Sequence, residues 1–201
     1  MPQHAFYGCR GFSASLIIPD SVTSILAGAF YESNVNFVSI PNSVSAIPGT
    51  LFANSDLTRV ALPDSITKIG MNAFYGCSRF TSVNIPDSVT ELEYEAFGRS
   101  KLSHVELPDS VTTMGTGVFA GVSALTSVKL PIGLEEIAQS SFADCSSLTS
   151  VKIPDSVKMI SWVSATPTGA HPCPHVHTHV HVHTCVHVPL HTLRKSQPLL
   201  L

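Results

Sequence analysis

Histidine occupies nearly every second position of the segment PHVHTHVHVHTCVHV, residues 174–188. Its alternating members are His175, His177, His179, His181 and His183. An extended chain would place these five imidazoles on one face, about 7 Å apart. Imidazole binds zinc, nickel and copper, and Cys173 and Cys185 add thiol groups. The tract therefore predicts adventitious Zn, Ni or Cu binding, although it lacks the separated ligand pairs of a metal site that a fold holds in place.

A second interpretation of the tract concerns its gene. Codons for His and Cys (CAC, TGC) and for Val and Thr (GTG, ACA) join into one alternating purine-pyrimidine run, and every residue from His175 to Val188 fits this run. The tract would then be a microsatellite translated after a frameshift, a retained intron or an error in gene prediction. An expressed but inert tail is the third interpretation, and the sequence leaves all three open.

The first 160 residues contain a repeat of 22 or 23 residues, which decides the fold. Its clearest marks are the prolines Pro19, Pro41, Pro63, Pro86, Pro108, Pro131 and Pro154. Apolar residues stand one and three positions before each proline, the period of a short strand, and proline marks where the strand ends. Eleven residues after the first six prolines stand Phe30, Phe52, Phe74, Phe97, Phe119 and Phe142.

A single repeat buries too few apolar side chains to offset the entropy of ordering its backbone, so neighbouring repeats must stack. Stacking pairs each strand in parallel with the next and gives a solenoid, with the phenylalanines inside. The Asp-Ser that usually follows the proline predicts a turn. We interpret the acidic residues at this position as turn formers: Asp20, Asp64, Asp87, Asp109 and Asp155.

Three cysteines share one repeat position, three residues after a phenylalanine: Cys9, Cys77 and Cys145. Each is three repeats from the next, which corresponds to about 14 Å in a stack of parallel strands. This separation exceeds the roughly 7 Å at which two Cα atoms can be bridged. We therefore expect buried free thiols and no disulfide among them.

The segments LTSVKIPDSVKMI and AFYGCSRFTSVNIPDSVTEL resemble the BspA-like leucine-rich repeat. The resemblance covers residues 4–160. It implies a leucine-rich repeat solenoid with short parallel strands on one face, and turns with short helical or 3-10 segments on the other. It also implies protein binding, with adhesion in some members, at the cell surface or after secretion if the N-terminus is incomplete. From the first residues, MPQHAFYGCRGF, we expect no signal peptide in this chain.

We divide the chain into a solenoid, residues 1–160, and a low-complexity His/Val/Thr/Pro tail, residues 161–201, expected to be disordered. In the strands, positions two and four before each proline should point outward and form the binding face. The residues predicted to contact a partner there are Ile17, Phe37, Arg59, Asn84, His104, Glu106, Lys129 and Lys152.

Composition narrows the function. The net charge of −3 and the absence of clustered basic residues argue against nucleic acid, and no apolar run is long enough to span a membrane. No nucleophile, base and orienting group converge, so we expect neither an enzyme nor a cofactor. The sequence predicts a non-enzymatic protein-interaction or adhesion module whose partner it does not identify. The alternatives are metal binding through the tail and a structural spacer in a longer repeat polypeptide.

Overall fold

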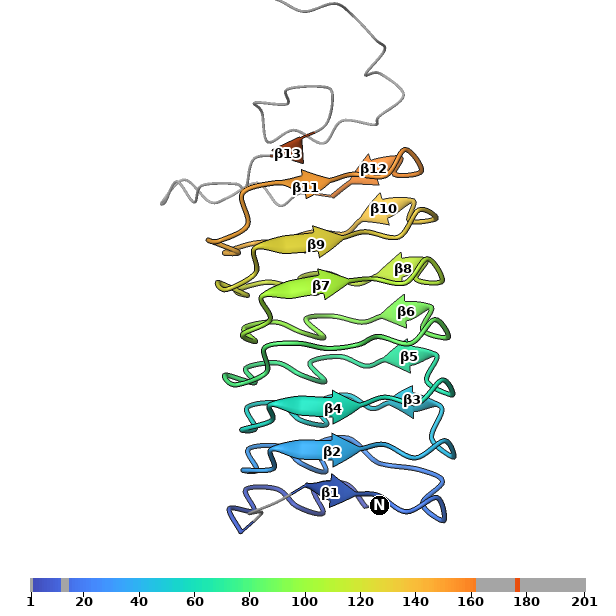
Figure 1. Ribbon diagram of the computed structural model, residues 1–201, viewed down its shortest axis with the longest axis vertical. Helices are drawn as coiled ribbons and strands as arrows, with labels where there is room; N and C mark the ends of the chain where they lie inside the picture. Colours follow the sequence, from blue (N-terminus) through green and yellow to red (C-terminus); the bar gives the residue numbers. More distant parts are fainter. Residues whose placement is uncertain (1, 12–14, 162–175, 178–201) are drawn as a thin grey trace, which may run out of the picture.

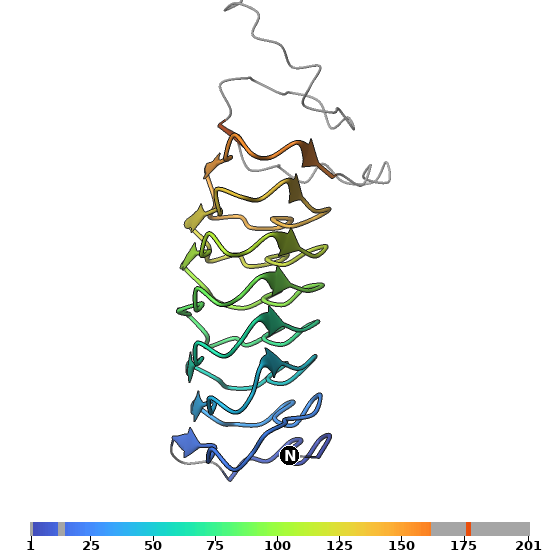
Figure 2. The same ribbon diagram turned by 90° about the vertical axis from the view of Figure 1, so that its right-hand side faces the viewer.

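The structure of the chain, a computed structural model, describes residues 2–11, 15–161 and 176–177. It is a parallel β-solenoid in which about seven coils, one for each repeat proline, stack along the long axis (Figures 1 and 2). Each coil consists of short strands joined by turns, around one continuous apolar interior. The predicted leucine-rich repeat solenoid is therefore confirmed, whereas the domain boundary at residue 160 and the disordered tail stay predictions because most of residues 161–201 lies outside the described residues.

The predicted strands form the first of two columns. They are β1 (Leu16–Ile17), β2 (Phe37–Ser39), β4 (Arg59–Ala61), β7 (His104–Glu106), β9 (Ser127–Lys129) and β11 (Val151–Lys152). All pairs are parallel and offset by one repeat, as in Val38↔Val60. β1, β2 and β4 form one sheet, and β7, β9 and β11 form another, which β13 (Val176–His177) joins beside β11. Residues 82–84, at the equivalent position between β4 and β7, form no strand.

A second column of strands lies on another side of each coil, where the sequence predicted no strand. Its members are β3 (Ala46–Ile47), β5 (Lys68–Ile69), β6 (Glu91–Leu92), β8 (Thr113–Met114), β10 (Glu136–Ile137) and β12 (Met159–Ile160). In Figure 1 their arrows point opposite to those of the first column. β3, β5, β6 and β8 pair continuously across the level at which the first column is interrupted.

The predicted helical or 3-10 segments around Ala-Phe are wrong, because no residue in the described ranges is helical. The backbone is left-handed two residues before and two residues after each phenylalanine, with positive φ in every coil. Around Phe74 these residues are Asn72 (φ 55°) and Gly76 (φ 67°), and around Phe97 they are Glu95 and Arg99. Two left-handed residues this close together break a right-handed helix and produce tight turns instead.

The phenylalanines form a stack through the interior, as predicted. From Phe6 to Phe142, successive ring centroids lie 5.3 to 5.8 Å apart with nearly parallel planes. The five rings from Phe30 to Phe119 are fully buried, and Phe142 is half-buried. Each buried ring therefore contributes apolar burial and an aromatic contact to both neighbouring coils.

The serine two residues after the proline donates a hydrogen bond from its hydroxyl to the preceding coil. Ser88 Oγ donates to the carbonyl oxygen of Ile66 at 2.6 Å, and Ser110 Oγ donates to that of Val89 at 2.7 Å. The same bond recurs from Ser43, Ser65 and Ser156. These serines thus hold adjacent coils together at a position where no strand pairs them. Gly133 replaces the serine in the sixth coil.

Candidate functional site

The first strand column sorts its side chains by alternation. Positions one and three before the proline face the interior, as Val105 and Leu107 do, each 1% exposed. The intervening residues point outward because successive side chains of a strand lie on opposite sides. We call the strand face the outward positions two and four residues before each proline, together with the positions five and seven residues before it, where the chain turns into the strand, within the described residues. Of the eight residues predicted to contact a partner, all except the half-buried Phe37 are exposed there, and their role in binding remains a prediction.

Apolar groups lie at the low-numbered end of the strand face. Ile17 on β1 is 72% exposed, an unusual degree for isoleucine. Phe37 on β2 pairs in register with Arg59 on β4, and the Arg59 guanidinium carbon lies 5.8 Å from the centre of the Phe37 ring. A guanidinium at this distance interacts favourably with an aromatic face, so it keeps the Phe37 ring partly covered.

Charged groups follow on β7, β9 and β11. His104 Nε2 lies 3.3 Å from Glu106 Oε1 on the same strand, and His104 Nδ1 contacts Ser127 Oγ of β9 at 2.5 Å. Glu106 is in register with Lys129, and Lys129 with Lys152. Neither lysine forms an ion pair with any residue in the described ranges. Among the described residues, the two ammonium groups therefore stand on adjacent strands without an ion-paired carboxylate.

Asn84 lies in the interruption between the two sheets of the first column. A hollow of about 460 Å³ opens beside it, lined on one side by Glu106 and Lys129 of the strand face. Its other side consists of residues from two proline turns, including Asp87 and Asp109. The hollow thus joins the strand face to the row of turn aspartates, and its lining is mainly polar.

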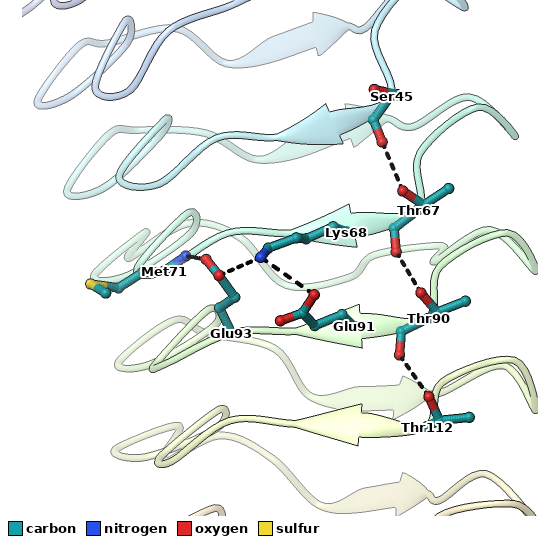
Figure 3. Close-up of polar contacts among 8 residues, drawn as sticks. All are labelled: Ser45, Thr67, Lys68, Met71, Thr90, Glu91, Glu93 and Thr112. Atoms are coloured by element: carbon teal, nitrogen blue, oxygen red, sulfur yellow. Dashed lines mark hydrogen bonds and ion pairs between the residues drawn. The ribbon is translucent and has the colours of Figure 1, made fainter.

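The second strand column carries charges too, and its lysines are paired with glutamates. Lys68 Nζ lies 2.6 Å from Glu93 Oε1 and 3.3 Å from Glu91 Oε2, and Glu93 also accepts a hydrogen bond from the Met71 amide (Figure 3). The hydrogen bond from Lys68 lowers the pKa of Glu93. Lys158 pairs with Glu135 at 2.6 Å in the same way.

Threonine hydroxyls beside this second column link successive coils. The Thr90 hydroxyl donates to the Thr67 carbonyl at 3.2 Å, and Thr67 and Thr112 repeat the contact with the coil before them (Figure 3). Lys68, Lys158 and these threonine hydroxyls are therefore engaged in contacts between coils.

The three cysteines of the described repeats are free, as predicted. Cys77 and Cys145 are buried, and their thiols donate to the carbonyl oxygens of Phe52 and Phe119 at 3.0 and 3.1 Å. Burial raises the pKa of both thiols to about 12. A thiol with such a pKa is almost wholly protonated near neutral pH, so neither residue is a nucleophile there. Cys9 is half-buried.

No group of three or more His, Cys, Asp or Glu residues in the described part of the chain is arranged to hold a metal ion. The predicted metal ligands His175, His179, His181 and His183 lie outside the described residues. The backbone of His177 pairs with Lys152 through β13. Within the ranges described, no helix is long and apolar enough to cross a bilayer.

Two exposed cations at the edge of the strand face were not predicted as partner-binding residues. Arg79 and Lys101 lie seven residues before their prolines, where the chain turns into the first column. Lys101 Nζ contacts Ser123 Oγ at 3.5 Å. Their common distance from the proline is the signal in the sequence that could have found them, although both lie outside the predicted strands.

Comparisons with known proteins support the same architecture. The family model described as BspA type leucine-rich repeat region (6 copies) matches residues 1–121 and 45–163. A leucine-rich repeat protein from Bacteroides ovatus is 30% identical with a TM-score of 0.68, over 75% of this chain and 43% of its own. A T. pallidum leucine-rich repeat protein is 28% identical with a TM-score of 0.65, over 70% of each chain.

A search of curated proteins gave no match. The chain spans less than half the length of the Bacteroides ovatus protein. The family model, in contrast, covers nearly all of the described solenoid with repeated copies of the pattern. The chain therefore belongs to the BspA-type leucine-rich repeat family.

Proposed function

We propose that the chain is a non-enzymatic protein-interaction module that binds its partner through the strand face. Leucine-rich repeats are in general protein-interaction modules, and solenoids present extended surfaces to their partners. The observation that carries the proposal is the contrast between the two sides of each first-column strand. The inward residues repeat almost unchanged, whereas the outward ones are exposed and differ in size and charge from coil to coil.

The chemistry of the strand face suits recognition of a protein. Ile17, Phe37 and Arg59 provide an apolar end with a guanidinium, and aromatic and arginine side chains are enriched among residues that dominate binding energy. Lys129 and Lys152 provide charge at the other end. An adhesive role at a cell surface is the specific form of this proposal.

Site-specific cross-linking tests the proposal. A photoreactive benzoylphenylalanine replaces Ser82, at the centre of the strand face, or Thr113, which is also exposed but lies on the second column. Each variant is illuminated in an extract of the source organism, and adducts are identified by mass spectrometry. We expect a discrete protein adduct from position 82 and none from position 113. The same adducts from both positions, or none from either, would favour the spacer interpretation.

A further inference from the structure

The charge of the solenoid is distributed unevenly. Up to residue 161 the sequence has nine Lys and Arg against fourteen Asp and Glu, a net charge of −5. The strand face nevertheless has five cations, namely Arg59, Arg79, Lys101, Lys129 and Lys152. It has only two carboxylates, Asp56 and Glu106, so its net charge is +3 with His104 neutral. The remaining residues of the same range therefore have a net charge of −8, and the strand face is a basic band on an acidic protein.

The lysines of the strand face differ from those of the second column in their partners. Lys68 and Lys158 are neutralised by glutamates 2.6 Å away. Lys129 and Lys152 face each other on adjacent strands, about 4.8 Å apart at the backbone, with no ion pair in the described ranges. Like charges at such positions repel each other. A carboxylate supplied by a partner would relieve this repulsion.

From these observations we propose that the strand face binds an acidic, extended polypeptide segment, whose carboxylates contact Lys129 and Lys152. This inference rests on the proposed function and specifies the class of its partner. In an extended segment, alternate side chains lie about 6.7 Å apart, a spacing that two flexible lysine side chains can match. The path from Phe37 to Lys152 crosses five coil spacings, about 24 Å, which corresponds to roughly seven extended residues.

A polypeptide fits this face better than a polymer of phosphates. Glu106 lies within the band, beside Lys129, and a uniformly anionic polymer would approach its carboxylate as well as the lysines. A polypeptide can place a neutral or basic side chain there and apolar side chains near Ile17 and Phe37. The row of turn aspartates next to the band repels an acidic segment that drifts sideways, which favours one position on the face.

The test uses the full chain and a fluorescein-labelled twelve-residue peptide of alternating Glu and Thr. A peptide with Gln in place of Glu is the neutral control. The K129E/K152E variant reverses both charges of the strand face. The K68E/K158E variant makes the same change in net charge on the second column, and circular dichroism and urea midpoints verify that both variants fold. Binding is followed by fluorescence anisotropy at low and high salt.

We expect the Glu peptide to bind the wild type, more weakly as salt rises, and the Gln peptide not to bind. K129E/K152E should raise the Kd about tenfold or more, and K68E/K158E by less than about twofold. Equal losses in both variants, or equal binding of both peptides, would overturn the proposal. A twelve-nucleotide oligothymidylate that binds more tightly than the Glu peptide, with the same dependence on Lys129 and Lys152, would assign the face to nucleic acid instead.

The cross-linking experiment shows whether a failure concerns only the acidic class of partner or the proposed protein-interaction function itself. A protein adduct at position 82 together with failure of the Glu peptide would leave the interaction module standing and remove the acidic class of partner. If the adduct forms, the cross-linked partner segment should carry more Asp and Glu than Lys and Arg. A basic segment at that position would contradict the inference directly.

Discussion

Replacing Gly133 with serine should stabilise the solenoid. Gly133 occupies the position at which five other coils carry the serine that donates to the preceding coil. A Cβ added at Gly133 would meet only the Asp109 carbonyl oxygen, at 3.9 Å, and its backbone is not left-handed. By the geometry of Ser110 and Ser156, the new hydroxyl would reach the carbonyl of Val111.

Two contributions determine the size of the effect. Replacing a glycine whose backbone suits other residues reduces the entropy of the unfolded chain, which stabilises by about 0.4–1 kcal/mol. A net intramolecular hydrogen bond adds about 0.5–1.5 kcal/mol. Gly133→Ser should therefore increase the free energy of unfolding by about 1–2.5 kcal/mol, and Gly133→Ala by about 0.4–1 kcal/mol. In a chain of this length the serine variant should raise Tm by about 2–10 °C.

Urea and thermal unfolding, followed by circular dichroism, measure these changes. The difference between the serine and alanine variants isolates the hydrogen bond between coils. If Gly133→Ser is no more stable than Gly133→Ala, the serine ladder contributes no net stability at this position. If both variants are less stable than the wild type, the backbone conformation at residue 133 differs from the one described.

Other perturbations test the interior, the second column and the thiols. Phe74→Ala should lower the free energy of unfolding in urea by about 3–5 kcal/mol, because the ring is fully buried between two others. Lys129→Ala, on the surface, should change it by less than about 0.5 kcal/mol. Equally small effects of the two substitutions would contradict the phenylalanine stack. Glu93→Gln should lower stability by about 0.2–1 kcal/mol at neutral pH. The pKa of Glu93 is lower in the folded state than in the unfolded chain, where it is about 4.3. The difference in stability between wild type and Glu93→Gln should therefore persist as pH falls to about that unfolded pKa, and vanish as pH falls further. A difference in stability that does not depend on pH would refute the ion pair. A short pulse of N-ethylmaleimide at pH 8, analysed by peptide mapping, should label Cys9 well before Cys77, and equal labelling would contradict the burial of Cys77.

The first column and the interior could be predicted from the sequence because inward positions permit little variation. Valine recurs three residues before six of the seven prolines, and phenylalanine recurs at one spacing, since each must fit against similar neighbours above and below. The second column was missed because its strands have two residues each, too short for an alternation to be recognised.

The left-handed turns were missed for a different reason. The residue two positions before the phenylalanine has positive φ whether it is Gly28, Thr50, Asn72 or Glu95. Glycine is the usual sign of this conformation, and here it is present in only some coils. Backbone hydrogen bonds to the neighbouring coil stabilise the turn instead. For example, the Phe52 amide donates to the Ala73 carbonyl oxygen of the next coil at 2.8 Å. Tertiary contacts thus override the local preference, and a helix was predicted where none forms.

The positions of the strand face that lie two and four residues before each proline could be predicted from the repeat because alternation fixes which side chains of a strand point outward, whereas Arg79 and Lys101 at its edge were not predicted. Its charge could not be assessed from the overall composition, which is acidic. Only the pairing of Lys68 and Lys158 with glutamates shows that the cations of the second column are neutralised, whereas Lys129 and Lys152 have no such partner among the described residues. Whether a lysine lies beside a carboxylate of the neighbouring coil depends on how the coils stack, and the repeat pattern of single residues does not show this.

The constant spacing of the ladder bonds has a kinetic consequence. The serine and cysteine bonds between coils span only 21 to 26 residues, from Ser43 to Val22 or from Cys145 to Phe119. The entropy lost in closing a loop depends on the number of residues in the loop, so each coil that docks incurs a similar cost. Contact order relative to chain length consequently falls as coils are added. Folding can begin at any pair of adjacent coils and spread in both directions. In a longer array of the same repeat, the rate at which each further coil docks therefore need not decrease.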